Sequence, residues 1–274
     1  MAKNNLCDYH IHTHYSSDSS EKPENIIRHA IDSGLAEICF TDHMDLDYPY
    51  TTEYENPAFV FDTEAYYREL SALRDKYAGD IKIKIGVELG LIPYLKERNK
   101  AVADSVPFDF IIGSTHQIDG KDPYYPEFWA GRDYDDVVNE YFVLTYDNVR
   151  TYSDYDVYGH LDYITRYAPD KSYHFDYMKH FDIIDCILKE IIRTGHGIEL
   201  NTSPLCKGLD RTNPCPEIVK RYKELGGETI TIGSDAHIFK NVGGHFDTAR
   251  EILLSCGFKY YSVFTDRKME MRSI

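Results

Sequence analysis

Short apolar runs alternate with amphipathic segments along nearly the whole chain. The apolar runs predict β-strands at 6–12, 37–41, 81–88, 108–113, 156–160, 197–201, 229–233 and 259–264. The amphipathic segments predict helices at 23–33, 62–78, 93–104, 134–152, 176–194, 214–225 and 246–256. Several helices begin at Pro or Asp and several end at Gly, as helix termini favour. This regular alternation is typical of parallel strands joined by crossover helices.

The number of strand–helix units predicts a distorted parallel (β/α)7 barrel of the α/β class, similar to a TIM barrel. At 274 residues, the chain has a suitable length, because such barrels take about 250 residues. No linker, internal repeat or low-complexity stretch separates the units. We therefore expect a single barrel domain over residues 1–274.

Polar side chains follow almost every predicted strand. The first strand runs into DYHIHTHYSSD (8–18), in which His10 and His12 are two residues apart and share one face of an extended chain. The later strands end in TDH (41–43), GVE (86–88), GSTH (113–116), GHLD (159–162), ELN (199–201) and GSDAH (233–237). In a parallel barrel, the carboxyl ends of the strands converge on one mouth, where the chemistry takes place. We therefore expect a metal site at the C-terminal ends of the strands.

The side chains at these ends form a candidate ligand set of six histidines and three carboxylates. They are His10, His12, Asp18, His43, Glu88, His116, His160, Asp235 and His237. Nine ligands are too many for one tetrahedral zinc ion and suit two or three borderline divalent ions such as Zn, Mn or Fe. Multinuclear centres of this kind activate water and stabilise phosphoryl displacement, so the set predicts a metal-dependent hydrolase.

The motifs DYHIHTHYSSD, TDH, GVELG, GSTHQIDG, GHLDYITRY, ELN and GSDAH, in this order, resemble those of the polymerase and histidinol phosphatase (PHP) superfamily. In particular, they are similar to those of its monofunctional histidinol-phosphate phosphatases of histidine biosynthesis, and the resemblance extends from residue 8 to about residue 265. It implies three divalent ions and hydrolysis of L-histidinol phosphate. The implied ligand groups are His10, His12, Glu88 and Asp235 for the first ion, Glu88, His116 and His160 for the second, and Asp18, His43 and His237 for the third.

Residues outside the ligand set are candidates for catalysis and substrate binding. Arg166, six residues after His160, is expected to bind a phosphate oxygen, since guanidinium favours bidentate contacts with phosphate. Gln117 and His245 are further candidate substrate contacts. The general acid for the leaving alkoxide stays open between Asp42, His196 and His245, although His196 precedes its strand and so lies at the end opposite the mouth.

Charge limits the partners that the chain can have. The formal net charge is −16, from 30 Lys and Arg against 46 Asp and Glu, which argues against a nucleic-acid or membrane partner and favours a small phosphate monoester as substrate. Six scattered cysteines without a Cys-x-x-Cys pair, and no apolar run of 18 residues, predict a cytoplasmic protein. The sequence does not define an oligomeric state.

Three other functions compete with this interpretation. An amidohydrolase would need a lysine where Glu88 stands, and a binding module would lack ligands of the set. Another PHP-type phosphoesterase or nuclease remains the alternative, although the negative charge opposes a nuclease. Two tyrosine-rich tracts, 45–61 and 122–134, are interpreted either as self-packed surface loops or as lids over the site.

Overall fold

The computed structural model describes residues 6–49, 58–170 and 173–274, and its centre is a sheet of parallel strands. The strands are β1 (Cys7–Asp8), β2 (Glu37–Phe40), β3 (His43–Met44), β4 (Lys82–Gly90), β5 (Phe110–Ser114), β6 (Val157–Tyr158), β7 (Gly197–Asn201) and β8 (Ile230–Gly233). They follow the order β1-β2-β4-β5-β6-β7-β8, and the short β3 also pairs with β4. Nearly all their residues are buried, because helices cover the outer face of the sheet.

The two ends of this sheet meet and close it into a barrel. The backbone N–H of Tyr9 donates to Ile232 O at 3.0 Å, and His12 N–H donates to Ala236 O at 3.0 Å. The stretch after β1 stays extended, but side-chain groups accept some of the hydrogen bonds that its backbone would otherwise make to a neighbouring strand. Ile11 N–H, for example, donates to Thr41 Oγ1 at 3.1 Å. The predicted α/β barrel of seven parallel strands is therefore confirmed, with a first strand shorter than the predicted 6–12.

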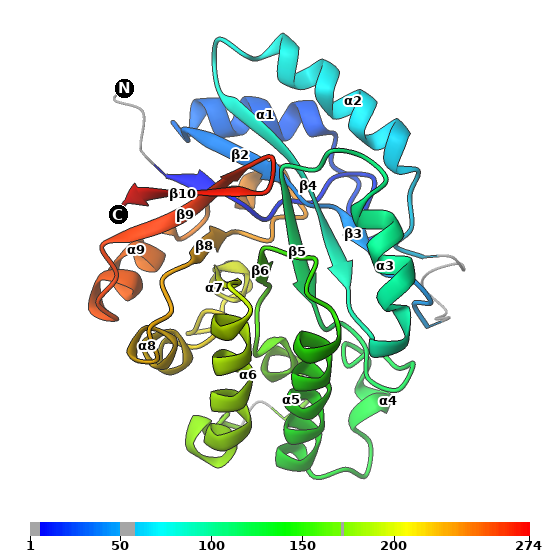
Figure 1. Cartoon of the computed structure of the whole chain (residues 1–274), viewed down its shortest axis with the longest axis vertical. Helices are drawn as coiled ribbons and strands as arrows, with labels where there is room; N and C mark the ends of the chain where they lie inside the picture. The colour runs from blue at the N-terminus through cyan, green and yellow to red at the C-terminus, as the bar shows by residue number, and fades with distance from the viewer. Residues whose placement is uncertain (1–5, 50–57, 171–172) are drawn as a thin grey trace.

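Helices surround the barrel on its outside (Figure 1). They are α1 (Pro23–Asp32), α2 (Thr63–Lys76), α3 (Lys96–Ala103), α4 (Pro126–Trp129), α5 (Tyr134–Thr151), α6 (Phe181–Arg193), α7 (Ser203–Cys206), α8 (Pro216–Glu224) and α9 (Phe246–Ser255). Asp62 and Asp133 cap α2 and α5 by accepting two backbone N–H groups each. The predicted helices 93–104 and 176–194 each begin with a 3-10 turn, and α4 and α7 were not predicted because they are single short turns.

The predicted last strand does not join the barrel. Instead β9 (Tyr260–Thr265) pairs antiparallel with β10 (Lys268–Ser273), and Asp266 and Arg267 form the turn between them at positive φ. The hairpin packs on the N-terminal ends of the barrel strands, where Arg272 pairs with Glu37 at 2.7 Å and Arg267 with Asp156 at 2.6 Å. It therefore covers the end of the barrel opposite the predicted metal site.

The Tyr9 hydroxyl joins this hairpin to the barrel. It is buried, accepts a hydrogen bond from Phe264 N–H at 2.9 Å and donates to the Glu37 carboxylate. Tyr9→Phe leaves a buried N–H and a carboxylate oxygen without this partner, so we expect a loss of about 1–3 kcal/mol in the free energy of unfolding. Urea unfolding would measure it, with Tyr260→Phe at the exposed start of β9 as the control. An unchanged midpoint for Tyr9→Phe would contradict the role of this contact.

Candidate metal centre

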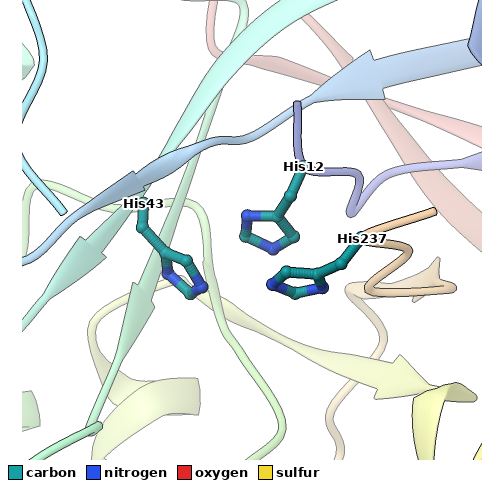
Figure 2. Close-up of side chains that lie close together, drawn as sticks. All are labelled: His12, His43 and His237. Carbon is teal, nitrogen blue, oxygen red and sulfur yellow. The ribbon is translucent and has the colours of Figure 1, made fainter. Parts of the chain in front are cut away.

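The nine predicted ligands lie together at the C-terminal end of the barrel. Glu88 projects from β4, His43 begins β3, and the other members follow the strands in loops. Figure 2 shows His12, His43 and His237, which come from three separate segments, with their imidazole rings gathered at one place. The His12 ring centroid is 4.2 Å from that of His43 and 4.1 Å from that of His237. The sequence prediction that these side chains converge is thus matched by the fold.

The Glu88 carboxylate occupies the middle of the cluster, and histidines approach both of its oxygens. On the Oε2 side, His10 Nε2 lies at 3.1 Å, His12 Nε2 at 3.6 Å and His43 Nδ1 at 2.9 Å. On the Oε1 side, His116 Nε2 lies at 3.2 Å and His160 Nε2 at 2.9 Å. A carboxylate with nitrogen ligands at each oxygen has the arrangement required to bridge two cations.

Two further carboxylates lie at the edge of the cluster. Asp235 Oδ1 is 3.3 Å from His12 Nε2 and 3.9 Å from His10 Nε2, so it adjoins the Oε2 side of Glu88. Asp18 Oδ2 is 3.0 Å from His237 Nε2 and 3.8 Å from His43 Nε2. His12 also approaches His43 and His237 closely enough to form a group with them.

Unpaired buried atoms show that the cluster fits cations. His10 Nε2, His12 Nε2, His43 Nδ1, His237 Nε2 and Glu88 Oε2 are all buried, and within the described residues none of them makes a hydrogen bond. Buried polar atoms normally have a partner, because leaving one without costs about 1–3 kcal/mol. Nitrogen and carboxylate oxygen atoms that face one another in this way suit divalent ions of borderline softness.

The electrostatics of the cluster keep two of the candidate ligands, Glu88 and His12, in the form that a cation needs. Burial would raise the pKa of Glu88, but His10, His116 and His43 hold it well below its ordinary value, so the carboxylate stays ionised. Burial, with His237 and His43 nearby, lowers the pKa of His12 well below its ordinary value. An ionised carboxylate and a neutral imidazole are the metal-binding forms. In four other histidines burial would lower the imidazole pKa but neighbouring carboxylates raise it, so a cation would displace protons from His10, His43, His116 and His237.

A surrounding set of polar side chains, which the sequence analysis did not assign, orients the histidines. Glu199 Oε1 lies 2.6 Å from His10 Nδ1, and Asp45 Oδ1 lies 2.7 Å from His116 Nδ1. Ser16 Oγ lies 3.0 Å from His12 Nδ1. Such partners fix which ring nitrogen faces the metal. Glu199 could have been found from its position in the ELN motif at a strand end, whereas Asp45 carried no comparable signal.

A cavity of about 300 Å³ opens beside the cluster. Its wall includes the candidate ligands His43, His116, His160, Asp235 and His237, together with Arg166, Asp122 and several aromatic rings. The aromatic lining consists of Tyr48, Phe59, Tyr124, Tyr163 and Tyr167. Both tyrosine-rich tracts thus contribute to the cavity, and Tyr48 donates a hydrogen bond to Asp122 that joins them. Residues 50–57 of the first tract lie outside the described residues.

Arg166 lies in the wall of this cavity with most of its guanidinium group buried. One terminal nitrogen, Nη1, is 3.3 Å from Asp235 Oδ2, and Nε donates to Asn213 Oδ1 at 2.9 Å. The other terminal nitrogen, Nη2, is buried and has no hydrogen-bond partner among the described residues. A cationic donor is therefore available beside the candidate ligands.

The remaining candidates are not brought to the cavity. Asp42 is buried and accepts hydrogen bonds from Thr13 N–H at 2.6 Å and Ser16 Oγ at 2.8 Å, a geometry that favours a structural role in the His10–Ser16 loop. His245 is exposed at the start of α9. Gln117 is buried and is absent from the described cavity wall. His196 lies at the opposite end of the barrel, where its Nε2 bonds to the Ser153 carbonyl oxygen at 2.8 Å. Their predicted roles as acid or substrate contact gain no support from this placement.

The sequence pattern of the PHP domain family matches residues 8–203, which contain seven of the nine clustered ligands. The chain belongs to the PHP domain family. The PHP match also covers the GHLDYITRY segment that carries His160 and Arg166. Asp235 and His237 lie beyond it, on the loop after β8 that closes the site.

The chain is similar to known proteins along almost its full length. A histidinol-phosphatase from Lactococcus lactis subsp. lactis is 32% identical over 264 residues, covering 96% of each chain. A protein from Clostridium acetobutylicum, named "Probable histidinol-phosphatase", is 35% identical over 265 residues, which are 96% of this chain and 97% of that one. The crystal structure of the Lactococcus lactis histidinol phosphate phosphatase, complexed with zinc, L-histidinol and phosphate, superimposes with a TM-score of 0.89 at 31% identity, covering 97% of this chain and 99% of that one.

No helix in the three described stretches is long and apolar enough to cross a membrane.

Proposed function

We propose that this PHP protein is a metal-dependent phosphomonoesterase that hydrolyses L-histidinol phosphate to L-histidinol and inorganic phosphate, a reaction of histidine biosynthesis. The observation that carries the proposal is a ligand cluster centred on Glu88 beside a cavity lined by Arg166, in a chain similar over 96% of its length to a histidinol-phosphatase. The cavity volume of about 300 Å³ suits a small phosphate ester better than a polymer.

Three divalent ions would be held by ligands that share Glu88 and its neighbours. His10, His12, Glu88 and Asp235 would hold the first, and Glu88, His116 and His160 the second. Asp18, His43 and His237 would hold the third, and the short distance from His12 to the last two rings supports a compact centre. Zinc is present in the related Lactococcus lactis structure, and manganese or iron suit the same ligands. Bound ions of this kind lower the pKa of water and neutralise charge on phosphate oxygens.

The chain's own groups position the ester. The free Nη2 of Arg166 would donate to a phosphate oxygen, and its Nη1 contact with Asp235 would hold the guanidinium beside the ligands. The Tyr163 ring lies over the same guanidinium, 4.9 Å from its carbon to the ring centroid, and limits its rotation. The reacting phosphate would therefore be held beside the candidate metal ligands.

The aromatic part of the cavity wall around Asp122 suits a cationic leaving group. Asp122 is almost fully buried, lines the cavity together with Tyr48 and Tyr124, and accepts a hydrogen bond from the Tyr48 hydroxyl. A carboxylate surrounded by aromatic rings attracts an ammonium or imidazolium group. The histidinol part of the substrate carries such groups, so Asp122 is a candidate contact for it.

Asp122→Asn is expected to raise the KM for L-histidinol phosphate about tenfold, because a charged hydrogen bond to the leaving group becomes neutral. Hydrolysis of an aryl phosphate, whose aryl leaving group carries no positive charge, should change little in the same variant. Steady-state kinetics with both substrates would measure the difference. Asp119→Asn, in the neighbouring turn, is the matched control. Equal losses on both substrates would contradict a leaving-group role for Asp122.

The decisive experiment is phosphate release by metal-loaded protein from L-histidinol phosphate, an aryl phosphate and a phosphodiester, each with a chelator-treated control. We expect chelator-sensitive turnover of L-histidinol phosphate far above that of the other two. Metal analysis of the same preparation should give more than one equivalent per chain, and about three when fully loaded. Preferential turnover of the diester, or a single metal equivalent with full activity, would overturn the proposal.

A further inference from the structure

The Arg166 guanidinium is held by a relay of buried side chains on the side away from the metal ligands. Its Nε–H donates to Asn213 Oδ1 at 2.9 Å, while its Nη1 faces Asp235. Arginine has five N–H donors, and these two contacts use one at Nε and one at Nη1. Three donors remain, one on Nη1 and both on the unpaired Nη2, and the edge between the two terminal nitrogens is therefore available to a ligand.

Asn213 is itself rigidly placed. It lies between α7 and α8, is fully buried, and exchanges two backbone hydrogen bonds with Asn201 at the end of β7, at 2.8 and 3.0 Å. Its side-chain Nδ2 donates to the Asp162 carboxylate, and the second oxygen of Asp162 accepts Cys215 N–H at 2.9 Å. Asp162 is also fully buried. The relay thus links the end of β7, through Asn213, to the guanidinium in the cavity wall.

The chemistry of the relay requires an amide in the middle. An amide oxygen accepts from the arginine on one side, and the amide nitrogen donates to the carboxylate on the other. A carboxylate at position 213 could accept from Arg166 but would face Asp162 without a proton to donate. Because both neighbours fix the amide orientation, the guanidinium plane has one favoured position.

We propose that Asn213 and Asp162 are positioning residues that turn the terminal-nitrogen edge of Arg166 toward the phosphate group of the substrate. The inference rests on the proposed function, because it assumes that Arg166 binds phosphate. The relay leaves Nε unavailable to the substrate, so the phosphate meets Arg166 through Nη2 and the remaining Nη1 donor. Neither Asn213 nor Asp162 would touch the substrate.

The test uses inorganic phosphate as the probe and compares Asn213→Asp, Asp162→Asn and the double variant that contains both. In the double variant, the carboxylate introduced at position 213 can accept from Arg166, and the amide introduced at position 162 can donate to that carboxylate. The relay is then restored with its two middle groups exchanged.

We expect Asn213→Asp to raise the inhibition constant for phosphate and the KM about tenfold, with a smaller change in kcat and unchanged metal content. In the double variant, the inhibition constant for phosphate and the KM should return to within about threefold of the wild-type values. Asp210→Asn, exposed on the same segment, is the control.

Each outcome separates the positioning role from a purely structural one. Wild-type phosphate inhibition in Asn213→Asp would overturn the inference, and so would a double variant no better than the single ones. Urea unfolding identifies a variant that fails to fold, in which case Asp162→Asn and the double variant still decide the question. Arg166→Ala is measured alongside. If it leaves phosphate inhibition unchanged, the phosphate role of Arg166 fails. If Arg166→Ala weakens phosphate inhibition but the Asn213 and Asp162 variants do not, then Arg166 binds phosphate and only the positioning role of Asn213 and Asp162 is refuted.

Discussion

Replacing Glu88 by glutamine is expected to remove both bound metal and turnover. Glu88 lies within 2.9 to 3.6 Å of five imidazole nitrogens and contributes both of its oxygens to the cluster. An amide cannot bridge two cations, because one of its two terminal atoms is a nitrogen that carries protons and has no free lone pair. Activity should fall by more than about 100-fold, since even partners of metal ligands cost 10- to 100-fold when they are changed. Metal analysis and kinetics on the same sample would measure both effects.

The control for Glu88→Gln is Glu97→Gln, a change of the same chemistry at an exposed position of α3. We expect the control to keep metal content and turnover. Full activity in Glu88→Gln would refute a bridging role, whereas lost activity with full metal content would limit Glu88 to a contribution after metal binding.

Removing the Arg166 guanidinium is expected to weaken substrate binding strongly. Arg166→Ala deletes a buried cation in the cavity wall, together with its unpaired Nη2, so we expect KM to rise about 10- to 100-fold, the effect of one or two hydrogen bonds to a charged group. Metal content should be retained, because Asp235 keeps His12 and His10 as neighbours. Steady-state kinetics together with metal analysis would check both parts.

Arg221→Ala provides a matched control for Arg166→Ala. Arg221 pairs with Asp185 at 2.6 Å on the surface between α6 and α8, away from the cavity, and its loss should leave KM unchanged. Loss of metal from Arg166→Ala would show instead that the guanidinium holds Asp235 in place for metal binding.

The architecture and the convergence of the candidate ligands could be predicted because each signal is local. In the sequence, a buried parallel strand is seen as an apolar run, and its end is seen as a change to polar residues. A parallel barrel then brings the carboxyl ends of all its strands together. Glu88 and His116 were therefore identified without knowledge of distances. The pairing of β9 with β10 was missed because a run such as 259–264 has the same pattern whether it pairs in the barrel or outside it, and because β10 is mostly exposed and is not an apolar run.

The surroundings of the ligands were harder to predict. Asp45 and Asn213 act through contacts with residues far along the chain, and nothing in the residues beside them marks that contact. Nothing in the sequence indicated that the oxygens of Asp42, one of the three candidates for the general acid, accept hydrogen bonds from Thr13 and Ser16. Hydrogen-bond partners of this kind depend on side-chain directions that a sequence pattern does not specify.

The meeting of the first and last barrel strands has a consequence for biosynthesis of the protein. The Asp8 carboxylate accepts a hydrogen bond from the Ser234 hydroxyl across 226 positions of sequence, and Asp235 and His237 follow directly. A chain emerging from the ribosome therefore has its first histidines long before the carboxylate that completes their group. Contacts of such long range form late in folding, because loop closure must precede them. Capture of the proposed metal ions would thus have to await synthesis of the chain beyond His237, and a shorter chain would hold only part of the candidate ligand set.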